Sequence, residues 1–163
     1  LPLDSVMGAA DKMFGHKSLV LAPGMEITLP LRTVLSEDEK RLYVTNDPTM
    51  LVFDVQGPGK LANRKEFKLE AGGNGDGLAV DRNGNLYVAA GPAVQVYDKN
   101  QKYLGVIPTP TNGRPTGQAF AGPDRKTLYV VVQATTDAYG HPLAGRTIYR
   151  IPMLAQGLPA RSK

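Results

Sequence analysis

Residues 79–88 read AVDRNGNLYV: a short apolar strand, a polar turn, and a second strand that begins with the Leu-Tyr-Val triplet at 86–88. Asp, Asn and Gly favour tight turns, whereas Tyr and Val favour strands, so this stretch predicts a β-hairpin. The same triplet recurs at 42–44 and at 128–130, at separations of 44 and 42 residues, and a polar turn precedes it each time. This periodicity predicts one supersecondary unit that is used three times.

Further strands are predicted around each hairpin. Residues 51–55, 93–97 and 147–151 favour a third strand, and residues 65–69 and 103–107 favour a fourth, outer strand after the first two triplets. Four short strands in a period of about 40 to 50 residues are typical of a β-propeller blade. The predicted fold class is therefore all-β, with blades of four antiparallel strands and about 3.5 blades in this chain. A β-sandwich in which the triplets recur by chance is the alternative.

The domain prediction is a partial propeller over residues 1–163. Blade-like repeats are expected at 18–70, 71–110 and 111–155, after an N-terminal remnant at 1–17 and before a tail at 156–163. A propeller has to close, because otherwise its first and last blades expose unpaired faces and edges. Closure is possible if the chain is part of a longer one, if it pairs with a separate N-terminal polypeptide, or if two copies assemble. Missing N-terminal blades, in the same precursor or in a partner, are the favoured interpretation.

Composition excludes several classes of site. The chain has no cysteine, which rules out disulfides, thiolate chemistry and cysteine-based zinc sites. The formal net charge is +4, but Lys and Arg are scattered, so no nucleic-acid partner is expected. No apolar run reaches the roughly 18 residues of a membrane-spanning helix, so no membrane span is expected. The two histidines, His16 and His141, lack the spacing of metal ligands.

Four stretches, in this order and spacing, resemble the SMP-30/gluconolactonase family. They are LSEDEKRLYV at 35–44, GDGLAVD at 75–81, NGNLYVA at 83–89 and RPTGQAFAGPD at 114–124. The resemblance extends from about residue 18 to the end of the chain. It implies a six-bladed propeller, to which this chain contributes the later blades, with a functional site at the axial mouth.

The resemblance also implies the chemistry of that mouth. Family members hold a divalent cation there through oxygen ligands, usually Ca²⁺, with Zn²⁺ or Mg²⁺ as alternatives. The metal polarises a lactone carbonyl and activates water, while a carboxylate moves the proton. Asp76 corresponds to the Asp of the family's Pro-Asp-Gly motif, which makes it the expected metal ligand and general base. A plain turn role between Gly75 and Gly77 is the alternative.

Two other family positions are not matched in this chain. The expected Asn of a Pro-Asn-Gly motif corresponds to Leu31, which cannot ligate a metal, and that of a Pro-Thr-Asn motif corresponds to Gly117. Asn46 and Asn74 are candidates to supply amide oxygens to a substrate. Arg32 is a candidate to bind an anionic substrate or to replace the charge of the metal. The plainer alternatives are a strand-end turn for Asn46 and an ordinary exposed side chain for Arg32.

Three functions are compatible with these residues. The preferred one is a metal-dependent hydrolase of lactones or related esters, acting on a small lactone or sugar-derived substrate. A non-catalytic propeller that binds a small molecule or a protein partner is the alternative, suggested by Leu31. A purely structural half-ring is the third. Localisation stays open, although residues 151–157 are similar to exported bacterial members of the family, which favours the periplasm or secretion.

Overall fold

The computed structural model describes residues 18–22, 25–28, 32–109, 113–133, 136, 140–141 and 145–159. Within these residues the chain forms thirteen strands and no helix. A helix suited to crossing a membrane is accordingly absent from this part of the chain. The strands are β1 (Ser18–Ala22), β2 (Met25–Thr28), β3 (Thr33–Leu35), β4 (Arg41–Asn46), β5 (Thr49–Gly57), β6 (Lys60–Lys68), β7 (Gly75–Val80), β8 (Leu86–Ala90), β9 (Ala93–Tyr97), β10 (Tyr103–Pro108), β11 (Arg114–Ala121), β12 (Thr127–Gln133) and β13 (Thr147–Pro152).

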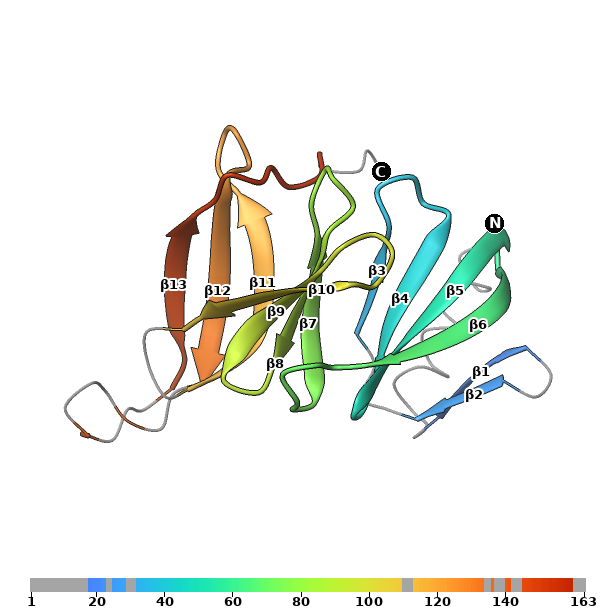
Figure 1. The fold of residues 1–163 in the computed structure, drawn as a ribbon, viewed down its shortest axis with the longest axis horizontal. Helices are drawn as coiled ribbons and strands as arrows, with labels where there is room; N and C mark the ends of the chain where they lie inside the picture. The colour runs from blue at the N-terminus through green and yellow to red at the C-terminus, as the bar shows by residue number, and fades with distance from the viewer. Residues whose placement is uncertain are drawn as a thin grey trace.

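The strands form antiparallel sheets in which each strand pairs with its neighbours along the chain (Figure 1). The first sheet holds β3 to β6, the second β7 to β10 and the third β11 to β13, while β1 pairs with β2. The three larger sheets stand side by side like blades, and β7 contacts both β3 and β11. The first strand of each sheet is therefore the innermost. The all-β blade architecture is confirmed, although the third sheet has three strands within the described residues.

The Leu-Tyr-Val triplet of β8 serves two interfaces at once. Leu86 and Val88 are completely buried in a cluster shared with the first sheet. Tyr87 points the other way, into a cluster shared with the third sheet, where its ring lies 5.1 Å from the ring of Phe120. Successive side chains of a strand face opposite sides, so a triplet of three apolar residues suits a blade that is packed on both faces.

The polar turn before this triplet is held by Asp81, which is fully buried. Its Oδ1 accepts hydrogen bonds from the backbone N–H groups of Asn83 and Asn85, at 2.8 and 2.9 Å. Its Oδ2 accepts from the Asn85 side chain at 2.8 Å and from the Tyr87 hydroxyl at 3.0 Å. Burial, and then the adjacent carboxylate, raise the pKa of Tyr87. Gly84 has a φ of 79°, a conformation that glycine adopts without strain.

The segment after β13 ties the second and third sheets together at this same end. Gly157 forms a β-bridge with Asp81 and donates its N–H to the carbonyl oxygen of Arg125 at 2.9 Å. The Gln156 carbonyl accepts the N–H of Arg82 at 2.8 Å. The Asp81 turn is therefore part of the packing between blades as well as the end of a hairpin.

Candidate active site at the mouth

The innermost strands β3, β7 and β11 all begin at one end of the molecule, the lower end in Figure 1. We call this end the mouth. Near it, β7 and β11 approach so closely that a Cβ atom on Gly77 would overlap the Cα atom of Gly117. Glycine at position 77 is therefore required for the two blades to meet at this distance.

Asp76, the second residue of β7, lies between two arginines at the mouth. The Nε atom of Arg32, just before β3, is 3.4 Å from Oδ1 of Asp76. A guanidinium nitrogen of Arg114, the first residue of β11, is 3.4 Å from Oδ2. The Asp76 side chain is 20% exposed, whereas those of Arg32 and Arg114 are 56% and 54% exposed. Three neighbouring blades thus each bring one charged group to the same point.

A second carboxylate, Asp47, lies close to this group in the turn between β4 and β5. Partial burial is the main cause that raises the pKa of Asp47, and the charge of Asp76 acts in the same direction. Arg114 and the backbone N–H of Gly75 act in the opposite direction. Asp47 therefore interacts with both ends of the Asp76–Arg114 pair. We call Arg32, Asp47, Asp76 and Arg114 the mouth cluster.

The other residues expected at the site, Asn46 and Asn74, lie near the mouth cluster in the chain but are not part of its ion pairs. Asn46 is the last residue of β4, and its Nδ2 donates to the Thr49 hydroxyl within the same hairpin at 3.3 Å. Asn74 is exposed and directly precedes β7. Leu31 and His16 lie outside the described residues. The structure thus brings Arg32 to Asp76 and leaves Asn46 engaged in its own turn.

Arg114 and Asp47 were missed by the sequence analysis. Arg114 was included only within the family-like stretch at 114–124, and Asp47 was not considered for the site. A partial signal was present, because Arg32 and Asp76 each stand ten residues before their Leu-Tyr-Val triplets and so share one phase of the repeat. Arg114 stands fourteen residues before its triplet, in a longer strand, so this phase does not find it.

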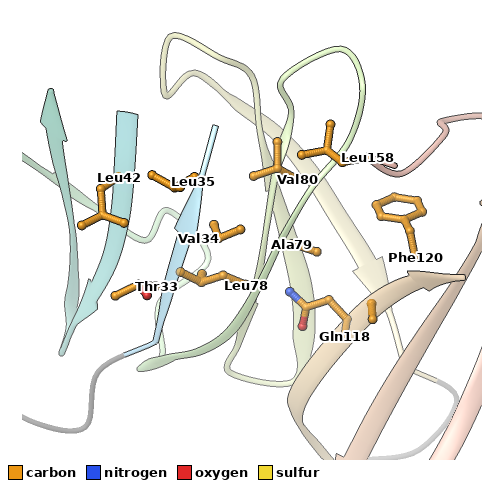
Figure 2. A pocket seen from close by; sticks show the side chains of 11 residues that line it. Thr33, Val34, Leu35, Leu42, Leu78, Ala79, Val80, Gln118, Phe120 and Leu158 are labelled. Carbon is orange, nitrogen blue, oxygen red and sulfur yellow. The ribbon is translucent and has the colours of Figure 1, made fainter. Parts of the chain in front are cut away.

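A largely apolar cavity of about 530 Å³ lies along the inner strands β3, β7 and β11 (Figure 2). Its wall includes Thr33, Leu78 and Gln118. These residues follow Arg32, Asp76 and Arg114 of the mouth cluster by one, two and four positions in the chain. The side-chain amide of Gln118 donates to the carbonyl oxygens of Gly77 at 2.9 Å and Tyr87 at 2.8 Å. An apolar cavity of this size with polar groups at its rim is the usual form of a small-molecule site.

The described residues do not fit a divalent cation at Asp76. Ca²⁺ prefers about six to eight oxygen ligands, but this part of the chain contains no group of three acidic or histidine side chains placed to hold a metal. A divalent cation on Asp76 would lie beside both guanidiniums. Its repulsion from each arginine would cost on the order of several kcal/mol in a partly shielded site.

Comparison with known proteins finds similarity to a gluconolactonase and to solved structures of related proteins. A gluconolactonase of Zymomonas mobilis is 27% identical over 131 residues, which are 70% of this chain and 36% of that protein. The structure of a luciferin-regenerating enzyme superposes with a TM-score of 0.67 at 23% identity, over 81% of this chain and 48% of that one. A calcium-binding protein of Agrobacterium tumefaciens, regucalcin, superposes with a TM-score of 0.64 at 21% identity, over 83% and 52%.

The chain therefore spans little more than a third of the curated relative that it matches. The two structural similarities, both below 25% identity, support the propeller fold. The sequence profile of the SMP-30/gluconolactonase/LRE-like region matches residues 24–134, about two thirds of the chain. This protein is a member of the SMP-30/gluconolactonase/LRE-like family.

Proposed function

We propose that this chain carries part of the active site of a hydrolase of lactones or related esters, at the axial mouth of a complete propeller. The observation that carries the proposal is Asp76, a mostly shielded carboxylate between two guanidiniums, on the same strand as residues that line a cavity of about 530 Å³. The similarity to a gluconolactonase supports the substrate class. Small lactones of sugar acids are the first substrates to test.

The mouth cluster contains the groups that lactone hydrolysis needs. Water has to lose a proton as it attacks the carbonyl carbon, negative charge develops on the carbonyl oxygen, and the ring oxygen has to gain a proton as it leaves. In the proposed reaction, Asp76 takes the proton from water and returns it to the ring oxygen when the C–O bond breaks. Arg32 and Arg114 stabilise the negative charge. Asn46 and Asn74 are the proposed contacts to substrate hydroxyl groups.

A metal-dependent form of this proposal competes with it. The family resemblance implies Ca²⁺ at Asp76, with Zn²⁺ or Mg²⁺ as alternatives, and one similar structure is that of a calcium-binding protein. The two arginines oppose a cation at this position, so we derive no step through a metal. Metal dependence predicts that EDTA abolishes the activity and that Ca²⁺ restores it, whereas the arginine-based form predicts that EDTA has no effect.

A complete ring requires further blades, and the third sheet offers a place for one. The tyrosine of each triplet faces the following sheet: Tyr43 packs in the cluster with the second sheet, and Tyr87 packs on the third. The equivalent Tyr129 is 37% exposed, and Ile148, the residue of the neighbouring strand β13 that pairs with Val131, is 65% exposed. We propose that an additional blade, supplied by an N-terminal segment or partner, covers this face. Intact mass and oligomeric state of the native protein test this arrangement.

A non-catalytic propeller that binds a small molecule or a protein partner at the same mouth is the second candidate. The arginine pair favours it, because two guanidiniums are sufficient to bind an anion without any proton transfer. The two candidates differ in one measurable property, since only the hydrolase consumes a lactone.

The test is hydrolysis of glucono-1,5-lactone by the native protein, followed by acid release at constant pH. We expect catalysis above the spontaneous rate and a loss of about 100-fold or more in Asp76→Asn, the usual effect of removing a general base. Asp98→Asn is the matched control, because Asp98 holds a turn between β9 and β10 through the N–H groups of Asn100 and Lys102. An unchanged rate in Asp76→Asn would exclude the proposed role.

A further inference from the structure

We infer that the mouth cluster is a recognition site for a small organic carboxylate, and that Arg32 and Arg114 together bind the carboxylate group of an open-chain sugar acid. The choice of a sugar acid rests on the proposed function, because opening a sugar lactone produces a carboxylate of this class. The binding site itself is argued from the geometry of the two arginines.

The two guanidiniums come from different blades and converge on one carboxylate. Each contacts Asp76 at 3.4 Å, which is longer than the 2.7 to 2.9 Å or so of an optimal charge-assisted hydrogen bond. More than half of each arginine side chain remains exposed. The exposed part of each side chain is the surface that a second carboxylate would contact.

The preference for an anion comes from the N–H donors of the two guanidiniums rather than from the net charge of the mouth cluster. Asp47 also interacts electrostatically with Arg114, so the two guanidiniums and two carboxylates of the cluster balance each other in formal charge. A guanidinium offers a planar fork of N–H donors that matches a carboxylate. A divalent cation, by contrast, finds the oxygens of Asp76 already facing two positive groups.

The cavity beside the cluster fits the rest of such a ligand. It holds about 530 Å³ and starts at Thr33, one residue after Arg32. This volume is within the range of about 300 to 1,000 Å³ found for small-molecule sites. The carboxylate would lie at the rim, on the arginines, and the carbon chain would extend along the inner strands toward Leu78 (Figure 2).

The experiment is a calorimetric titration of the native protein with sodium gluconate and, in parallel, with calcium chloride, at an ionic strength matched by sodium chloride. We expect gluconate to bind at one site per chain and Ca²⁺ to show no saturable binding. Arg32→Gln and Arg114→Gln should each weaken gluconate binding about tenfold or more. Arg82→Gln is the matched control, because Arg82 is exposed in the turn at the opposite end of β7, and it should leave the affinity unchanged.

Two results would overturn the inference. One is saturable Ca²⁺ binding that is lost in Asp76→Asn; the other is gluconate affinity that is equal in Arg114→Gln and the wild type. Arg114→Lys keeps the positive charge but removes the planar pair of guanidinium donors, so it should also weaken gluconate binding. An unchanged gluconate affinity in Arg114→Lys would show that the guanidinium geometry is not required. Thermal unfolding of each variant verifies that it is folded.

The inference and the proposed hydrolase can fail separately. If the protein binds gluconate through both arginines but hydrolyses no lactone, the proposed hydrolase is wrong and the inferred carboxylate-binding site stands. If lactone hydrolysis depends on Asp76 but gluconate affinity is unchanged in both arginine variants, the hydrolase stands and the inferred carboxylate-binding site is wrong.

Discussion

Two aspartates five residues apart, near the two ends of β7, lie in opposite environments. Asp81 is fully buried, and the hydrogen-bond donors to its carboxylate come from the next six residues. Asp76 is one-fifth exposed, and its partners Arg32 and Arg114 lie 44 and 38 residues away in the chain. Asp81 therefore stabilises its own hairpin, whereas Asp76 takes part in an arrangement that exists only when three blades are assembled.

The difference teaches where to look for function in a repeat protein. A carboxylate whose hydrogen bonds are local and complete has no capacity left for a ligand, and its contribution is to stability. A carboxylate held loosely by partly exposed groups from other blades contributes little to stability and is available for binding or chemistry. Substitutions at Asp81 should therefore affect stability, whereas substitutions at Asp76 should affect binding or catalysis.

The largest loss of stability is expected for Asp81→Ala. The substitution leaves the buried Tyr87 hydroxyl and two turn N–H groups without their acceptor, at a cost of about 3 to 5 kcal/mol. Urea unfolding measures it. Asp98→Ala is the control, because Asp98 is only partly buried and should cost about 1 to 2 kcal/mol. Equal losses at the two positions would contradict the assignment.

Gly77→Ala should destabilise the protein by about 2 to 3 kcal/mol, because its Cβ overlaps the backbone of β11 and cannot be relieved by a side-chain rotation. It should also weaken the mouth cluster, since β7 and β11 carry Asp76 and Arg114. Gly117→Ala is a close control: a Cβ atom there meets nothing within 4 Å. We expect a change of less than about 1 kcal/mol for this control, measured by the same urea unfolding. If both substitutions cost the same, the close approach of the strands is not the cause.

Asp76→Asn should change the free energy of unfolding by less than about 1 kcal/mol, because its two ion pairs are long and their arginines are exposed. Unfolding in low and high salt should show a small dependence that disappears in the variant. A loss comparable to that of Asp81→Ala would mean that Asp76 is structural.

The smallest effect is expected at Asp47. Its pKa is raised by partial burial and by Asp76, so the folded protein disfavours the ionised form. This destabilising contribution is present above the folded pKa and disappears as the pH falls toward the unfolded value near 3.9. Asp47→Asn should therefore leave stability equal or slightly higher at neutral pH and equal at pH 3. A clear loss of stability at neutral pH in Asp47→Asn would contradict the direction of the shift.

Much of the fold could be predicted from the sequence because each repeat is specified by residues that are close together in the chain. The Leu-Tyr-Val triplet alternates between two packed faces, and the preceding turn carries its own hydrogen-bond donors and acceptors, so ten residues specify one hairpin. Three occurrences at nearly constant spacing then predict three blades. Neither inference requires knowledge of contacts between distant segments.

The site could be predicted only in part, because its contacts cross between blades. The Gly-Asp-Gly sequence and the family resemblance pointed to Asp76, Arg32 was a candidate to bind an anionic substrate, and the structure pairs the two. The role of Arg114 depends on the approach of β11 to β7, which no local pattern encodes. The shift in the pKa of Asp47 depends on desolvation in its turn and on charges from two other blades, which the sequence does not reveal. The catalytic role of Asp76 stays a prediction.

The most direct test of the division between the two aspartates is kcat/KM for glucono-1,5-lactone, expressed per folded molecule, in Asp76→Asn and Asp81→Asn. We predict that Asp76→Asn loses about 100-fold or more while it unfolds like the wild type. Asp81→Asn should unfold more easily but retain wild-type activity per folded molecule. Wild-type activity in folded Asp76→Asn, or the larger loss per folded molecule in Asp81→Asn, would contradict the account.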